Sequence, residues 1–145
     1  MPKIYVNTDN SNSKAKIYEA GKMGKSAAAA EKKMQEVVTA MIAKEADFVS
    51  DKSAVGKGYT IRIKVTNAAA AGRTTTYTAH PEIVRFPSTV GKGGKGEIMV
   101  STLTKDPEIQ VQGNSEDWLL EGVEGVTQNI VKKCLPLMRV DMTKR

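Results

Sequence analysis

The sequence contains very little of the chemistry on which catalytic and metal sites usually depend. It has one histidine, His80, one cysteine, Cys134, and one tryptophan, Trp118, in 145 residues. A zinc site in a protein needs three or four nitrogen, sulfur or oxygen ligands, and His80 has no second histidine with which to share a metal. Cys134 falls on an apolar helical stripe, where a core thiol is the favoured interpretation. We therefore expect no catalytic residue, no metal site and no cofactor.

The chain also lacks the features of a secreted or membrane-spanning protein. A single cysteine excludes an internal disulfide, which is typical of a reducing compartment. The first seven residues contain no apolar run of the kind found in a secretory signal. No segment approaches the roughly 20 apolar residues that a membrane-spanning helix needs. These observations favour a cytoplasmic protein without a membrane span.

Aromatic residues make up only 5% of the chain, so its core must consist of Val, Ile, Leu, Met and Ala. The hydrophobic share is 40% and the charged share 26%, which is typical of a folded protein rather than a disordered one. A chain of 145 residues is long enough to form its own core and is near the common size of one domain. We interpret residues 1–145 as a single domain.

Hydrophobic periodicity predicts two helices, at 26–46 and at 115–135. Ser26 is a suitable N-cap for the first, and acidic residues open the second, where they suit the helix dipole. Pro136 is expected to end or kink the second helix, because proline lacks the N–H that a helix interior requires. Residues 138–145 would then form a basic tail.

The block between the helices, residues 58–112, alternates as β-strands do. Strands are predicted at 59–66, 73–79 and 97–103, with a further alternating run at 108–112. Pro81 and Pro87 indicate an edge piece or an extended loop between them. Residues 88–96 are rich in glycine and read as a flexible loop. At the start of the chain, Lys-Ile-Tyr occurs at 3–5 and again at 16–18 across a polar turn, so residues 1–25 are interpreted as a β-hairpin or, alternatively, an extended arm.

These elements predict an α+β protein with an antiparallel or mixed sheet covered on one face by two helices. The order of elements is shared by many small α+β folds and carries no function by itself. Function must therefore be argued from the surface.

A basic face on the predicted sheet is one candidate surface. Phosphate groups are bound by such cations, but single-strand binders also want interleaved aromatic rings, and only Tyr59 and Tyr77 are available here. A plain solvated face is the favoured interpretation. The candidate residues for binding a polyanion are Arg62, Lys64, Arg73, Lys92 and Lys95.

A self-association surface is the other candidate. The net charge is +6, but residues 56–100 are mainly basic and residues 106–124 mainly acidic, a polarity that suits an anionic partner or head-to-tail association. Trp118 is more often a core anchor than a contact, but if exposed it is the best candidate for a binding hot spot. The candidate assembly contacts are Lys3, Ile4, Tyr5, Val6, Ile17, Tyr18 and Trp118.

The sequence therefore favours a non-enzymatic structural or interaction protein that forms homo-oligomers or belongs to a larger assembly. The alternative is a nucleic-acid or polyanion-binding protein that uses the basic β face. A small enzyme of unknown class is the third interpretation.

Overall fold

The computed structural model describes residues 3–7, 26–50, 58–86, 99–113 and 115–144. The predicted hairpin partner at 16–19 and the glycine-rich loop at 88–96 lie outside these ranges. The elements of the described residues follow one another as β1 (Ile4–Asn7), α2 (Ala27–Ala43), β2 (Phe48–Val49), β3 (Gly58–Ala71), β4 (Thr74–Phe86), β5 (Met99–Thr102), β6 (Glu108–Gln112) and α3 (Glu116–Thr143).

The strands form one mixed sheet in the order β2-β1-β3-β4-β5, and β6 also pairs with β4. The first strand, β1, runs parallel to both of its neighbours, β2 and β3. The remaining pairs are antiparallel. Of the two sheet types left open by the sequence, the mixed one is therefore correct.

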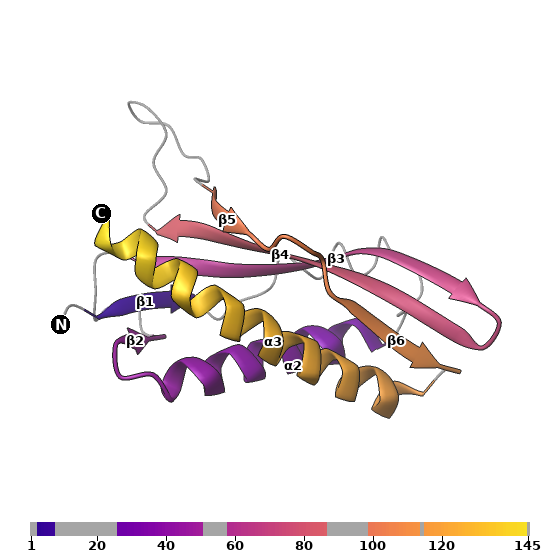
Figure 1. The fold of residues 1–145 in the computed structure, drawn as a ribbon. Coiled ribbons are helices and arrows are strands. Elements are labelled where there is room, and N and C mark those ends of the chain that lie inside the picture. The colour runs from indigo at the N-terminus through magenta and orange to yellow at the C-terminus, as the bar shows by residue number, and fades with distance from the viewer. Residues whose placement is uncertain (1–2, 8–25, 51–57, 87–98, 114, 145) are drawn as a thin grey trace, which may run out of the picture.

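Both helices cover the same face of this sheet, and α2 and α3 lie side by side against it (Figure 1). Apolar side chains from the helices and from the inner face of the sheet form one core. The predicted α+β architecture, with a sheet covered on one face by two helices, is confirmed.

The first helix, α2, matches the predicted span of 26–46 closely. Its buried residues recur every three or four positions, as expected for a helix with one apolar face. Ser26 differs from its predicted role, because its side chain makes no capping bond to the helix. The Ser26 hydroxyl instead donates to Glu116 Oε2 at 2.9 Å, which joins the start of α2 to the start of α3.

The second helix, α3, begins as predicted, with the Ser115 hydroxyl accepting a hydrogen bond from the Trp118 N–H at 3.2 Å. It does not end at Leu135. The helix continues through Pro136 to Thr143, so the predicted basic tail at 138–145 is wrong over most of its length.

Two sets of contacts hold these last turns of α3 in place. Arg139 forms ion pairs with Asp47 at 3.0 Å and Glu45 at 3.2 Å, and its guanidinium lies 4.9 Å from the centre of the Phe48 ring. Asp141 is buried and accepts hydrogen bonds from β3 and β4, as described below. Tertiary contacts therefore offset the proline, which local sequence preference could not reveal.

Pro81 lies in the interior of β4, where the sequence predicted an edge piece or a loop. The Ala79 N–H donates to the Pro107 carbonyl, and the Thr102 hydroxyl donates to the Pro81 carbonyl, each at 2.9 Å. Both bonds are on the side of β4 away from β3. Because the N–H and C=O of one strand residue point the same way, the missing N–H of Pro81 faces the gap between β5 and β6. The proline thus removes no hydrogen bond between β4 and β3.

The alanines at 68–71 belong to β3, which therefore extends beyond the predicted strand end at residue 66. Ala71 pairs with Thr74, so only Gly72 and Arg73 form the hairpin loop. Gly72 has φ of +61°, the left-handed conformation that such two-residue loops need and glycine adopts without strain.

The N-terminal strand β1 has a hydrogen-bonded neighbour on each side, so it does not offer a free edge. Ile4, Tyr5 and Val6 are buried in the core. A Cβ on Gly58 would lie 2.2 Å from the Tyr5 carbonyl oxygen, so only glycine allows β3 to approach β1 this closely.

Candidate functional site

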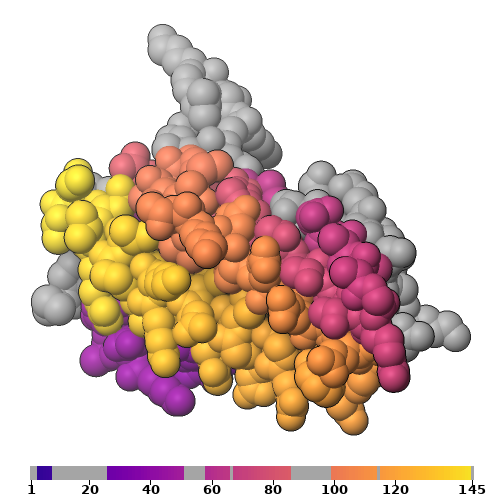
Figure 2. All heavy atoms as spheres, turned by 45° about the vertical axis from the view of Figure 1, so that its right-hand side comes forward, coloured from indigo at the N-terminus to yellow at the C-terminus, as the bar shows by residue number. Residues whose placement is uncertain are grey.

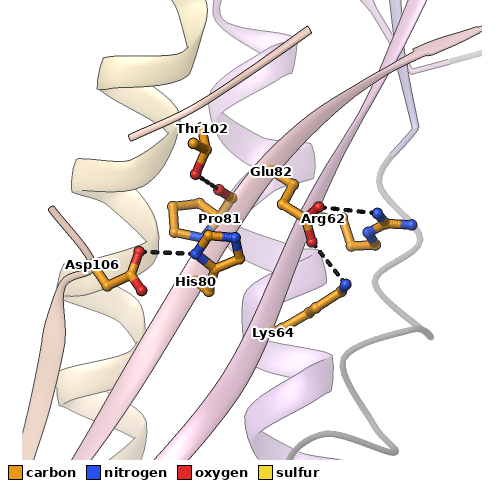
Figure 3. Close-up of polar contacts among 7 residues, drawn as sticks. All are labelled: Arg62, Lys64, His80, Pro81, Glu82, Thr102 and Asp106. Carbon is orange, nitrogen blue, oxygen red and sulfur yellow. Dashed lines mark hydrogen bonds and ion pairs between the residues drawn. The ribbon is translucent and has the colours of Figure 1, made fainter. Parts of the chain in front are cut away.

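One buried carboxylate, Glu82, offsets part of the positive charge on the predicted basic face of the sheet. Arg62 and Lys64 project from β3 on the side away from the helices, and Glu82 on β4 lies between them (Figure 3). Arg62 Nη2 is 3.2 Å from Glu82 Oε2, and Lys64 Nζ is 2.8 Å from Glu82 Oε1. Arg62 is 8% exposed and Glu82 only 3%.

Electrostatics keep this carboxylate ionised. Burial raises the pKa of Glu82, but hydrogen bonds and charges from Lys64 and Arg62 outweigh it, so the net pKa is below its ordinary value. A polyanion would have to compete with Glu82 for the same two cations. The sequence missed this pairing, although Glu82 is the one acidic residue on β4.

The other predicted polyanion contacts do not join Arg62 and Lys64 in one described cluster. Arg73 is exposed in the hairpin loop at the far end of β3. Lys92 and Lys95 lie outside the described residues. Tyr59 and Tyr77 are both buried, so neither offers an open ring on which a base could stack.

His80 and Cys134 lie in different environments. His80 Nδ1 is 3.0 Å from Asp106 Oδ1 at the outer face of the sheet (Figure 3). Cys134 is buried in the hydrophobic core, where burial raises the pKa of its thiol to about 12. Within the described residues, no group of three or more His, Cys, Asp or Glu side chains is arranged to hold a metal ion.

A second buried polar cluster joins the end of α3 to the sheet. Tyr59 Oη donates to Asp141 Oδ2 at 2.5 Å, and Arg85 Nη2 donates to Asp141 Oδ1 at 2.8 Å. These three residues come from β3, β4 and α3. Their contacts connect the chain's own elements, so we interpret the cluster as a structural link.

An open groove of about 660 Å³ runs along the side of α2. Its lining brings together small and polar side chains, with two oppositely charged residues one turn apart. These are Asn7, Lys32, Gln35, Glu36, Thr39, Ala40 and Ala43.

The predicted assembly contacts divide into three groups. Ile4, Tyr5 and Val6 are buried within the chain's own core, so they are not available as contacts, and only Lys3 is exposed on that segment. Ile17 and Tyr18 lie outside the described residues. Trp118 is 47% exposed, so the favoured interpretation as a core anchor is wrong and the contact interpretation stays open.

Trp118 lies on a continuous exposed stripe along α3. The residues of this outer stripe recur every three or four positions, and all are exposed: Trp118, Glu121, Gly125, Gln128, Lys132, Pro136 and Val140. The opposite side of α3 packs on the sheet. In Figure 2, α3 runs across the front of the molecule from orange to yellow, open along its length.

The outer stripe and its flanks change sign along the helix. The exposed side chains of the N-terminal half that carry charge are all acidic: Glu116, Asp117, Glu121 and Glu124. Those beyond the middle of the helix are basic: Lys132, Lys133 and Lys144. Val140 is 54% exposed and lies at the basic end, whereas Trp118 lies at the acidic end.

Sequence reasoning missed Val140 because it ended the helix at Pro136. Extending the same period of three or four residues past the proline would have placed Val140 on the stripe that contains Trp118.

Comparison of the chain with models of protein families, with curated proteins and with solved structures gives no match. Among the described helices, neither has the length and apolar character needed to cross a membrane. The surface of the chain itself must carry any functional argument.

Proposed function

We propose that the chain is a non-enzymatic interaction protein that self-associates, alone or as a subunit of a larger assembly. The observation that carries this proposal is the outer stripe of α3. Of the three large hydrophobic side chains that are highly exposed among the described residues, Trp118 and Val140 both lie on it.

A half-exposed tryptophan is a good anchor for a protein contact. Its ring can remove a large apolar area from water, and tryptophan is enriched among the residues that dominate binding energy. Isolated exposed apolar residues are common and need no explanation. Two exposed apolar residues on one helix face, with charges of opposite sign around them, form a pattern that a protein partner can recognise.

The alternative of polyanion binding receives less support from the geometry. Arg62 and Lys64 already have a buried carboxylate between them. Breaking a buried ion pair by removing its partner leaves an uncompensated charge, which is unfavourable. Lys132 and Lys133 on α3 are exposed, but the same helix carries four exposed acidic residues.

Size-exclusion chromatography with light scattering, which measures the mass of the eluting protein, tests self-association. We expect the apparent mass to rise above the 15.7 kDa of one chain as concentration increases, and to fall back towards it in high salt. Salt weakens contacts between exposed charges because the screening length falls to about 3 Å at 1 M. A mass of 15.7 kDa at every concentration, in low salt as well, would overturn the proposal.

A further inference from the structure

We propose that two copies of the chain pair through α3, with the helices antiparallel across a two-fold axis near Asn129. In this arrangement Trp118 of one copy lies against Val140 of the partner subunit. The inference rests on the proposed self-association and names the surface and symmetry through which it occurs.

The positions of the two hydrophobic residues set the register. Trp118 and Val140 are 22 positions apart, about 33 Å along a helix that rises 1.5 Å per residue. Their midpoint is Asn129. When one α3 is turned end over end about that midpoint, each Trp118 meets a Val140, and both exposed apolar side chains leave water together.

The charges along α3 fit the same two-fold rotation about Asn129. Glu121 and Glu124 precede the midpoint, and Lys132 and Lys133 follow it. An antiparallel pair therefore places the acidic half of each helix against the basic half of the other. A parallel pair would place acid against acid and base against base, which is repulsive.

The middle of the stripe permits close approach. Gly125 has no side chain, and no atom of the described residues lies within 4 Å of the position its Cβ would occupy. Gln128 and Asn129 are exposed and polar, and each can donate and accept hydrogen bonds across the axis. Packed helices are typically about 8–10 Å apart, and a small residue at the crossing favours the lower end of that range.

Self-complementarity selects a second copy as the occupant of this surface. A two-fold interface uses the same patch on both subunits, so each feature at one end must find its complement at the other end of the same patch. The outer stripe meets this requirement in hydrophobic residues and in charge. A different protein partner would need no such symmetry within the stripe.

Charge reversal followed by mixing tests the arrangement. One variant carries Glu121→Lys and Glu124→Lys, and the other carries Lys132→Glu and Lys133→Glu. Each variant alone would place like charges together at both ends of the pair, so we expect both to remain monomeric at concentrations where the wild type dimerises. Mixed in equal amounts, the variants face each other with opposite charges, and a dimer of one copy of each is expected.

A chain with all four reversals checks that the substitutions do not simply unfold α3. It restores complementarity within one sequence, so it should dimerise with itself. The hydrophobic contact has its own matched pair: Trp118→Ala should weaken dimerisation at least about tenfold, whereas Met99→Ala, which removes a side chain that is 52% exposed on β5, should not.

The results separate this inference from the function on which it rests. Charge-reversed variants that dimerise as the wild type does, or a mixture that stays monomeric while the wild type dimerises, would overturn the α3 arrangement and leave self-association standing. A wild type that never exceeds the mass of one chain would overturn both.

Discussion

Replacing Tyr59 with phenylalanine tests whether a buried hydrogen bond fixes the last turns of α3 to the sheet. Tyr59 Oη donates to Asp141 Oδ2 at 2.5 Å, and both residues are buried. The phenylalanine ring fills almost the same space, so the variant removes the hydrogen bond and little else. Asp141 keeps its contact with Arg85 in this variant.

The expected cost follows from the charge of the acceptor. A hydrogen bond to an ionised group contributes about 1.5–3 kcal/mol to stability, more than one between neutral groups. For a chain of this size each kcal/mol shifts the melting temperature by about 2–4 °C. We therefore expect Tyr59→Phe to lower the melting temperature by about 3–12 °C.

Chemical and thermal unfolding followed by circular dichroism measure this change. Tyr77→Phe is the matched control, because it makes the same substitution at another buried tyrosine on the neighbouring strand. Burial is the cause that raises the pKa of the Tyr77 hydroxyl, so we expect the loss of this hydroxyl to change stability little. Equal effects of the two substitutions would refute the assignment of a special role to the Tyr59–Asp141 bond.

Three further predictions concern the core and its ionised groups. Folding lowers the pKa of Glu82 below the ordinary 4.5, so its contribution to the unfolding free energy is complete above that pH and is lost as pH falls through the folded value. Glu82→Gln should therefore be less stable than the wild type at neutral pH and lose less stability in acid. If the unfolding free energies of the two proteins fell equally as the pH is lowered, the result would count against a stabilising role for the ion pairs of Glu82 with Arg62 and Lys64. Gly125→Ala should stabilise the monomer by about 1 kcal/mol through helix propensity, whereas Gly122→Ala should destabilise it, because a Cβ there would lie 2.7 Å from Ile109 Cγ2. Cys134, with a thiol pKa of about 12, should react with a thiol reagent far more slowly in the native than in the unfolded protein, and similar rates would contradict its burial.

The elements that the sequence predicted well are those whose own periodicity determines them. The apolar spacing of α2 and the alternation around Ile61 and Ile63 follow directly from burial on one face. The two prolines show where such reasoning fails. Pro136 is tolerated because Arg139 and Asp141 fix the helix beyond it, and Pro81 because two other strands leave a gap beside it.

The candidate sites were harder to predict than the fold. The alternation of β3 correctly placed Arg62 and Lys64 on the face away from the core, but a strand pattern does not say which residue of the next strand lies opposite. The register with β4, which brings Glu82 between the two cations, depends on a hairpin whose turn the sequence placed only approximately. Trp118 was identified as a contact candidate, yet its complement at Val140 required knowledge that α3 continues to Thr143.

A single-cysteine cross-link at Asn129 is the most direct measurement of the claim that two α3 helices pair across a two-fold axis. In the proposed dimer the two Asn129→Cys residues face each other near the axis, within the roughly 4–7 Å between Cα atoms that a disulfide needs. The control, Lys144→Cys, lies 15 residues from the axis, which separates its two copies by about 45 Å. The two-fold pairing of α3 predicts rapid oxidation of Asn129→Cys to a covalent dimer, with little dimer from Lys144→Cys or from the wild type, whose only thiol is buried. Slow cross-linking at Asn129→Cys in a protein that still dimerises, or equal cross-linking at both positions, would contradict the pairing of α3 across this axis.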